Sequence, residues 1–143
     1  METIKIMYHN PDLLPIEQKE GGDWIDLRAA ENVILKKGEW KLISLGVSME
    51  LPKGYEAHIV PRSSTFKNFG IIQTNSVGIV DNAYNSSEDV WCLSVLAIRD
   101  TEIHLNDRIC QFRIVKNQPK LLVHKATHLD NKTRGGFGST GIK

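Results

Sequence analysis

The chain has 143 residues, of which 41% are hydrophobic and 24% charged, and its formal net charge is +1. This length suits one domain with its own core, and the composition excludes a disordered or fibrous protein. The near-neutral charge argues against stable nucleic-acid binding, which usually requires a strong basic excess. Because no apolar run could cross a bilayer and residues 1–5 lack the features of a secretory signal, we expect a cytoplasmic protein without membrane contact.

Short apolar alternations rich in β-branched residues recur along the chain and are typical of an all-β sandwich or barrel. Glycine and proline in the turns at 36–39 and 51–54 supply the backbone geometry that chain reversal needs. One helical turn is expected over residues 63–69, with hydroxyl side chains able to cap its first amides. The last strand does not alternate strictly, which predicts a bulge or burial on both faces. Strands are expected at residues 4–6, 33–35, 40–47, 55–60, 91–98 and 108–114.

The C-terminal segment differs sharply from the rest, since residues 133–141 include four glycines. Such a segment cannot pack a core, so we expect a β domain over residues 1–130 and a flexible arm over 131–143 that acts as a lid. Residues 136–141 match the dinucleotide-binding pattern G-x-G-x-x-G, but only two residues follow where that site needs a helix.

Metal and thiol chemistry have little support in the sequence. His124 and His128 have the spacing of two metal ligands on a helix, yet their surroundings read as extended and no third ligand is evident. Cys92 and Cys110 lie in apolar surroundings without a CxxC partner, so we expect two small buried hydrophobes.

Two early segments are chemically informative. Asp26 stands directly before an apolar step, where an ordinary turn or cap is the bland alternative. Residues 61–65 join Arg62 to three hydroxyls after a strand, and this combination can bind phosphate oxygens through forked hydrogen bonds, hydroxyls and free amides. A solvated helix cap would explain the second segment equally well.

Three later segments complete the set. In residues 78–84, a short apolar run is followed by Asp81 at the turn of an expected hairpin. There the Asp81 carboxylate can orient a water, and the ring of Tyr84 can pack against a sugar. An Asx turn with a core tyrosine is the alternative. Arg108 and Gln111 stand near the start of a strand and can reach a ligand, or form a surface ion pair and a solvated amide. In the arm, Phe137 can stack on a base.

Taken in order, these five segments resemble the five motifs of the trimeric dUTPase family, and they span the chain from Asp26 to Gly141. The match is closest at residues 61–64, 81–84, 107–111 and 135–141, and the whole chain is most similar to members from Gram-positive bacteria and their phages. The resemblance implies a distorted jelly-roll or β-barrel fold of the β-clip type. It also implies a homotrimer with swapped C-terminal arms, whose active sites take segments from all three subunits.

The resemblance further implies Mg²⁺-dependent hydrolysis of dUTP to dUMP and pyrophosphate, which keeps uracil out of DNA and supplies dUMP for dTMP synthesis. Asp81 would hold the attacking water, and Asp26 would support the metal indirectly through water. Tyr84 would lie beneath the deoxyribose, and the backbone of residues 75–80 would read the uracil edge. The substrate-binding set implied is Arg62, Ser63, Ser64, Asn75, Gly78, Val80, Tyr84, Arg108, Gln111, Arg134, Phe137, Gly138 and Ser139.

The chain departs from the family pattern at two places. The last motif is two residues shorter between Arg134 and Phe137, so either Arg134 or Lys132 would meet the terminal phosphate. The third motif continues with a longer acidic loop before Trp91, which is an alternative to Phe137 as the stacking aromatic.

Two other functions remain open at this point. The dCTP deaminases share the fold and an Arg-Ser-Ser signature but need a glutamate to activate water at the base, where this chain has an Asp-to-Tyr segment. A regulatory protein that binds a repressor is the second alternative. Its candidate contact surfaces are residues 10–22 and 86–89, although both segments are more simply explained as solvated loops without a partner.

Overall fold

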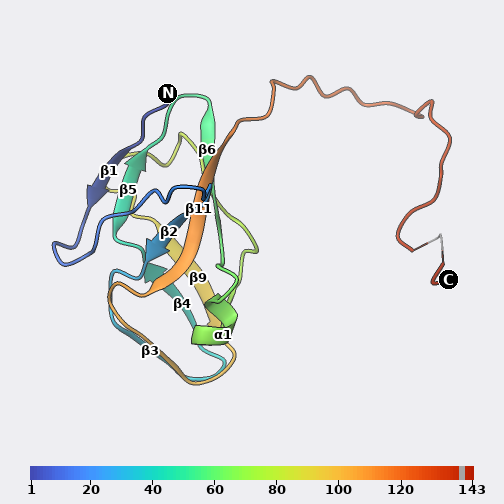
Figure 1. The fold of residues 1–143 in the computed structure, drawn as a ribbon. Coiled ribbons are helices and arrows are strands. Elements are labelled where there is room, and N and C mark those ends of the chain that lie inside the picture. The colour runs from blue at the N-terminus through green and yellow to red at the C-terminus, as the bar shows by residue number, and fades with distance from the viewer. Residues whose placement is uncertain (139–140) are drawn as a thin grey trace.

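The computed structural model describes residues 1–138 and 141–143, and over these residues the regular structure is almost all β-strand, which confirms the predicted fold class (Figure 1). One short helix interrupts the strands. The elements are β1 (Lys5–Tyr8), β2 (Ile25–Arg28), β3 (Val33–Leu35), β4 (Trp40–Ser44), β5 (Val47–Glu50), β6 (Tyr55–Val60), α1 (Thr65–Phe69), β7 (Ile71–Gln73), β8 (Gly78–Val80), β9 (Cys92–Ala97), β10 (Thr101–Ile103) and β11 (Arg108–Lys116).

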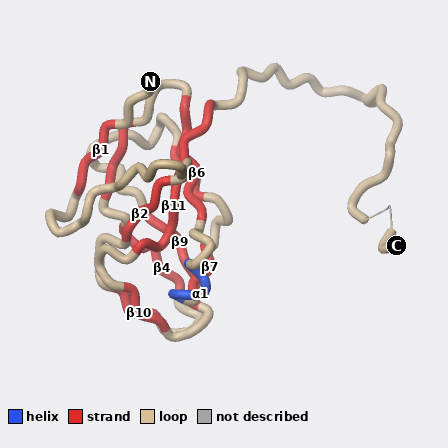
Figure 2. Tube along the Cα trace, viewed as in Figure 1, coloured by secondary structure: helices blue, strands red, loops and turns tan. Residues whose placement is uncertain are grey.

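Two sheets form the body of the molecule (Figure 2). One has the strand order β2-β11-β6-β8, the other has the order β4-β9-β7, and the pairs β1-β5 and β10-β3 complete the described strands. Every described pair is antiparallel. Because β11 lies between β2 and β6, residues from three distant parts of the sequence become neighbours in one sheet.

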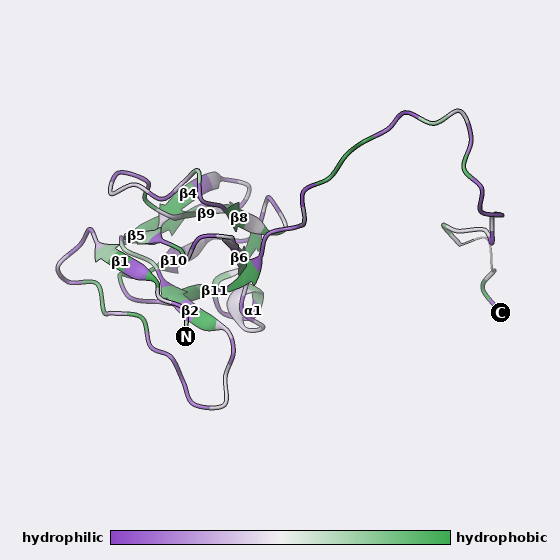
Figure 3. Cartoon of the chain, turned by 90° about the horizontal axis from the view of Figure 1, so that it is seen from above, coloured by the Kyte–Doolittle hydropathy of each residue, from purple (hydrophilic) through white to green (hydrophobic). Residues whose placement is uncertain are grey.

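The core consists of the inward-facing apolar side chains of these strands. Figure 3 shows the strands layered one above the other, with the extended C-terminal segment lying apart from them. The largest buried side chains are Trp91 and Phe112, whose rings meet edge to face with their centroids 5.4 Å apart. Such an aromatic pair contributes about 0.5–1.5 kcal/mol beyond its buried area.

The expected strand over residues 40–47 is in fact two strands, β4 and β5. Gly46 separates them with a φ of +66°, a left-handed conformation that glycine adopts without strain. A Cβ atom at this position would lie 2.5 Å from the Cβ of Ala30, so the close approach also requires glycine. The sequence prediction missed this break because the apolar run continues across it.

The expected bulge in the last strand is confirmed. The pairing of β11 with β2 shifts register between Arg108 and Cys110. An extra residue at such a point disturbs the regular alternation of side chains. Ile109 and Cys110 are consecutive in the chain and both fully buried.

Only one of the two cysteines behaves as expected. Cys110 is buried, and burial raises the pKa of its thiol far above the usual range. Cys92 is exposed, so its expected burial is wrong. The reason is its position at the start of β9, where the buried side chains are those of Leu93, Val95 and Ala97 and Cys92 belongs to the alternate face.

The C-terminal segment leaves the body after β11 ends at Lys116 (Figure 1). Its described part contains no strand or helix, and apolar side chains such as Leu122 and Val123 are 85% and 87% exposed. The division of the chain at residue 130 stays a prediction. Within the described residues, no helix has the length and apolar character needed to span a membrane.

Candidate active site

Asp26 is the centre of a cluster of charges on the four-stranded sheet. In the sheet register, Gln111 of β11 stands opposite both Asp26 of β2 and Val60 of β6, which brings Arg62 close to Asp26. The Asp26 Oδ1 atom lies 3.1 Å from Arg62 Nε, and Oδ2 lies 3.6 Å from Arg108 Nη1 and 4.0 Å from Lys19 Nζ. Three cations therefore share one half-buried carboxylate, and this excess of positive charge suits a polyanionic ligand.

The turn after β6 holds Arg62 through a buried threonine. Thr65 Oγ1 accepts a hydrogen bond from the Arg62 backbone amide at 2.8 Å and donates one to the Ile109 carbonyl at 3.0 Å. The Arg62 guanidinium also donates through Nη1 to the Arg108 carbonyl at 3.2 Å. Thr65 is a supporting residue that the sequence analysis did not single out. The sequence feature that could have identified it is a hydroxyl residue three positions after Arg62.

The hydroxyl groups at the start of α1 do not cap the helix as expected. Ser64 occupies the N-cap position but makes no side-chain capping hydrogen bond, because its backbone is helical, with φ −95° and ψ −4°, and lacks the extended conformation of a capping residue. Ser63 is exposed and Ser64 half-buried, beside Arg62. The Ser64 hydroxyl is therefore not used to cap the helix.

Gln111 lies at the same end of the sheet as Arg62. Its Nε2 atom donates a hydrogen bond to the Pro61 carbonyl at 3.1 Å. The structure thus brings together the four predicted groups Asp26, Arg62, Arg108 and Gln111. It adds Lys19, whose position in a polar loop gave no signal in the sequence.

Asp81 follows β8 directly and begins a tight turn. Its Oδ1 atom accepts a hydrogen bond from the Ala83 amide at 2.9 Å, and its carbonyl accepts one from the Tyr84 amide at 3.1 Å. This is the Asx turn that the sequence offered as the structural alternative to a catalytic role for Asp81. The turn engages one carboxylate oxygen and leaves Oδ2 without a hydrogen bond to any described residue, on an exposed side chain that can hold a water.

The hairpin expected at Asp81 to Tyr84 is not formed, because β8 pairs with β6 and not with β9, the next strand in the chain. β7 pairs with β9, so residues 74–77 connect two different sheets. Gly78 stands opposite Ile59, and a Cβ atom on Gly78 would lie 3.2 Å from the Ile59 Cβ. A short apolar run that ends in a turn does not show which strand that run pairs with.

Within one chain, Asp81 and Arg62 lie toward opposite ends of β6. Gly78 pairs with Ile59 and Val80 pairs with Ala57, so β8 runs toward the start of β6. Arg62, in contrast, follows the end of that strand. A single chain therefore does not bring the expected catalytic acid to the expected phosphate-binding cluster.

Tyr84 and Trp91 have different environments. The Tyr84 hydroxyl donates to the Val90 carbonyl at 2.8 Å, and burial, followed by the charges of Cys92 and Asp89, raises its pKa, so the hydroxyl remains a donor at neutral pH. Trp91 is 1% exposed and packs against Phe112. Trp91 is therefore a core residue and cannot stack on a ligand.

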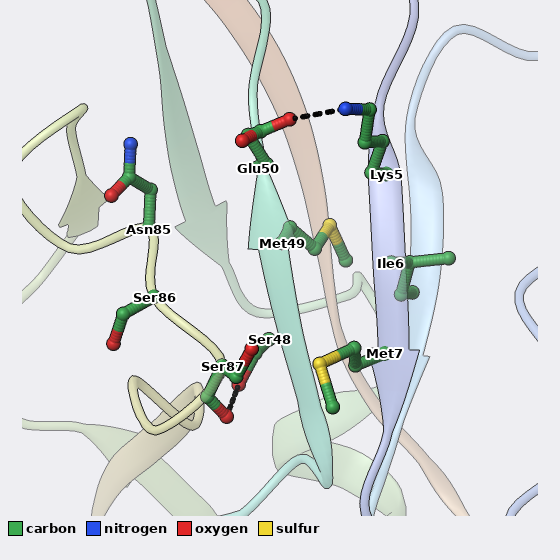
Figure 4. A pocket seen from close by; sticks show the side chains of 9 residues that line it. All are labelled: Lys5, Ile6, Met7, Ser48, Met49, Glu50, Asn85, Ser86 and Ser87. Carbon is green, nitrogen blue, oxygen red and sulfur yellow. Dashed lines mark hydrogen bonds and ion pairs between the residues drawn. The ribbon is translucent and has the colours of Figure 1, made fainter.

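The loop after Tyr84 closes a separate cavity of about 210 Å³ beside β1 and β5 (Figure 4). Buried Ser48 donates a hydrogen bond to the Ser87 carbonyl at 3.2 Å, and Lys5 and Glu50 form an ion pair at 3.1 Å. The departure from the family pattern in this loop is thus a folded feature attached to β5. The cavity is lined by Lys5, Ile6, Met7, Ser48, Met49, Glu50, Asn85, Ser86 and Ser87.

The predicted residues of the arm do not reach the Asp26 cluster in this structure. Arg134, Phe137 and Gly138 lie on the extended segment, with Phe137 fully exposed at a φ of +53°. Lys132 lies on the same segment. Ser139 is outside the described residues.

The described side chains do not form a metal cage of their own. No group of three or more His, Cys, Asp or Glu side chains among them could hold an ion. Both oxygens of Asp26 already face cations. The donor set is instead compatible with Mg²⁺ bound mainly through ligand phosphates and water, as is common for this ion.

Comparison with known proteins places the chain in a family. The family model described as dUTPase matches residues 14–141. The SPbeta prophage-derived deoxyuridine 5'-triphosphate nucleotidohydrolase of Bacillus subtilis is 56% identical over 140 residues, covering 98% of this chain and 99% of that protein. The deoxyuridine 5'-triphosphate nucleotidohydrolase of Neorickettsia sennetsu is 40% identical, with 98% and 96% covered.

Solved structures agree on the fold. The dUTPase of Staphylococcus bacteriophage 80alpha, a G164S mutant with dUpNHpp, superposes with a TM-score of 0.79 at 18% identity, covering 98% of this chain and 99% of that one. The β-clip architecture expected from the resemblance is thereby confirmed. The chain belongs to the dUTPase family.

Proposed function

We propose that this protein hydrolyses dUTP to dUMP and pyrophosphate. The observation that carries the proposal is the Asp26 cluster, in which Lys19, Arg62 and Arg108 surround one carboxylate in a chain of the dUTPase family. A triphosphate can replace the carboxylate as the partner of these cations. Asp26 then keeps the arginines oriented while the substrate is absent.

The chemistry follows from two separate groups of residues. Arg62, Arg108, Gln111 and the two hydroxyls of Ser63 and Ser64 hold the phosphates and neutralise charge that develops on them. Asp81 accepts a hydrogen bond from a water and aligns it for in-line attack on the α-phosphorus. A bond forms between that water oxygen and the phosphorus, the bond to the bridging oxygen breaks, and pyrophosphate leaves.

Specificity is assigned to the segment after β7. The backbone of Asn75, Gly78 and Val80 would read the uracil edge, and Tyr84 would lie beneath the deoxyribose. A pocket that hydrogen-bonds the base rejects cytosine strongly, because a mismatched base leaves buried polar groups unpaired. A tight pocket rejects thymine through its additional methyl group.

Mg²⁺ fits this site as an ion held by the substrate, with Asp26 supporting it indirectly through water. When bound, the ion neutralises part of the triphosphate charge and fixes its conformation. The protein's own contribution is to orient the phosphates through Arg62 and Arg108.

We further propose that the active protein is a homotrimer. Two observations support this assembly: one chain separates Asp81 from Arg62, and the outer face of the three-stranded sheet carries several exposed apolar side chains. Leu96 of the central strand β9 pairs with Trp40 of β4 on one side and with Ile72 of β7 on the other. Trp40 and Leu42 are 59% and 50% exposed. A continuous apolar row of this kind marks an interface. The exposed apolar side chains of the arm would be covered by exchange between subunits.

Disruption of this face should dissociate the protein. We expect Leu42→Asp to elute as a smaller species in size-exclusion chromatography with light scattering, because a buried unpaired carboxylate is strongly unfavourable. The turnover of dUTP by this variant should fall at least about tenfold. Ile34→Asp is the matched control, since Ile34 is 76% exposed on β3, outside this sheet. A Leu42→Asp variant with unchanged mass would contradict the assigned interface.

The function is tested by pyrophosphate release from dUTP, dTTP, dCTP and UTP, with Mg²⁺ and with a chelator. We expect turnover of dUTP alone, and its loss on chelation. The melting temperature of the ligand-free protein should stay unchanged on chelation, because the described side chains form no metal cage of their own. Comparable hydrolysis of all four nucleotides would refute the base pocket, and ammonia release from dCTP would indicate a deaminase.

A repressor protein as partner stays a prediction for residues 10–22 and 86–89. For the dUTPase of Staphylococcus bacteriophage 80alpha, control of the transfer of virulence genes is described. At 16% identity, the likeness to that protein extends to the fold.

A further inference from the structure

Gln73, the last residue of β7, has a buried side-chain amide at the base of the turn that precedes Gly78. The residue is 8% exposed, and its Nε2 atom donates to the Ile59 carbonyl at 3.0 Å and to Asn75 Oδ1 at 3.1 Å. These two acceptors determine the orientation of the Gln73 amide, because a flipped amide would place Gln73 Oε1 against the Ile59 and Asn75 oxygens. The Gln73 Oε1 atom is left buried without a partner among the described atoms.

This arrangement is unfavourable unless it serves a purpose. An unsatisfied buried acceptor destabilises the folded state, and such groups are few in native proteins. A methionine would fill similar space without an unpaired oxygen. The presence of an amide at this position therefore points to a need for its two donated hydrogen bonds.

The bond to Ile59 connects the two sheets, and the bond to Asn75 fixes the start of the turn. β7 belongs to the three-stranded sheet and Ile59 belongs to β6 of the four-stranded sheet. Asn75 is otherwise exposed, and its carbonyl accepts a hydrogen bond from the Val77 amide at 2.6 Å. Ser76, between them, has a φ of +62°, a left-handed conformation that is unfavourable for a residue other than glycine. Gln73 thus holds the strained turn through the Asn75 side chain.

Gly78 lies beside this amide. An added Cβ on Gly78 would lie 3.5 Å from Gln73 Nε2 and 3.2 Å from the Cβ of Ile59. Gln73 therefore borders Gly78 and also donates to Asn75. Both residues belong to the segment assigned to the base.

We propose that Gln73 is a positioning residue for base recognition, which holds Asn75 and the following turn in the conformation that accepts uracil. The proposal rests on the proposed function, in which residues 75–80 read the base. Gln73 acts through Asn75 and makes no contribution to phosphate binding, since Arg62 and Arg108 lie in other segments.

The test separates base binding from phosphate binding. Gln73→Met removes both donated hydrogen bonds at similar volume, and Gln73→Glu replaces the donor with an acceptor. We expect the KM for dUTP and the inhibition constant for dUMP to rise at least about tenfold, or about 1.4 kcal/mol. The kcat should stay within about threefold, and the inhibition constant for inorganic tripolyphosphate should not change.

Two controls distinguish positioning from stability. Ser48→Ala also removes a buried group that bridges two partners, His9 Nε2 at 2.7 Å and the Ser87 carbonyl, but away from the turn. It should lower the melting temperature without changing either inhibition constant. Asn75→Ala and Gln73→Met should be non-additive in a double-mutant cycle, because one acts through the other.

The possible failures are distinguishable. A wild-type protein that does not hydrolyse dUTP would refute the proposed function and this inference together. Normal wild-type turnover with unchanged dUMP inhibition in Gln73→Met, or with equal losses for dUMP and tripolyphosphate, would refute the inference alone. Loss of folding in both Gln73 variants would show that the role is structural and would also overturn it.

Discussion

Replacing Asp81 with asparagine is expected to lower kcat for dUTP at least about a hundredfold, a loss of about 2.7 kcal/mol of transition-state stabilisation. Asparagine has the same shape, and its Oδ1 atom can still accept the hydrogen bond that the Ala83 amide gives to Asp81. The turn should therefore survive. What is lost is the negative charge that orients a water and accepts its proton in the transition state.

Pyrophosphate release measures this effect, and calorimetric titration with a non-hydrolysable dUTP analogue shows whether binding persists. Asp89→Asn is a suitable control, because Asp89 accepts a hydrogen bond from the Ser86 amide in the neighbouring loop but has no proposed catalytic role. We expect that control to retain turnover. If Asp81→Asn kept more than a tenth of the wild-type kcat, another group would have to position the water.

Deletion of residues 132–143 is expected to abolish measurable turnover and to leave the melting temperature nearly unchanged. The described part of this segment contains no strand or helix, and its Phe137 ring is fully exposed, so removal sacrifices little buried area. Closure of the arm over a bound nucleotide would exclude water and strengthen the electrostatic interactions around the phosphates. Loss of the arm should remove both effects.

Single substitutions refine this prediction. Phe137→Ala tests stacking on the base, since Trp91 is a core residue. Arg134→Ala and Lys132→Ala identify which cation meets the terminal phosphate, through the KM for dUTP compared with inhibition by dUMP, which lacks that phosphate. A truncated protein with wild-type turnover would show that the arm is not a lid.

The chemistry of the site was largely readable from local sequence. Asp26, Arg62 and Arg108 stand in separate short motifs. Arg62 with its neighbouring hydroxyls indicated phosphate binding, whereas the role of Asp26 came only from the family resemblance. Strands, turns and the bulge in β11 were also predictable, since alternation and turn residues act over a few positions. The hairpin at Asp81 to Tyr84 was predicted wrongly, because local pattern cannot tell that β8 pairs with β6 and not with the next strand.

The tertiary structure alone decided which of these residues meet. Strand register placed Asp26, Gln111 and Val60 side by side, and the same register sent Asp81 toward the opposite end of β6. It also buried Trp91 and enclosed the amide of Gln73. Residue type and short-range pattern are properties of the local chain, so the sequence by itself determined the all-β class and the chemical groups available. Proximity depends on hydrogen bonding between strands far apart in sequence, which no local pattern specifies.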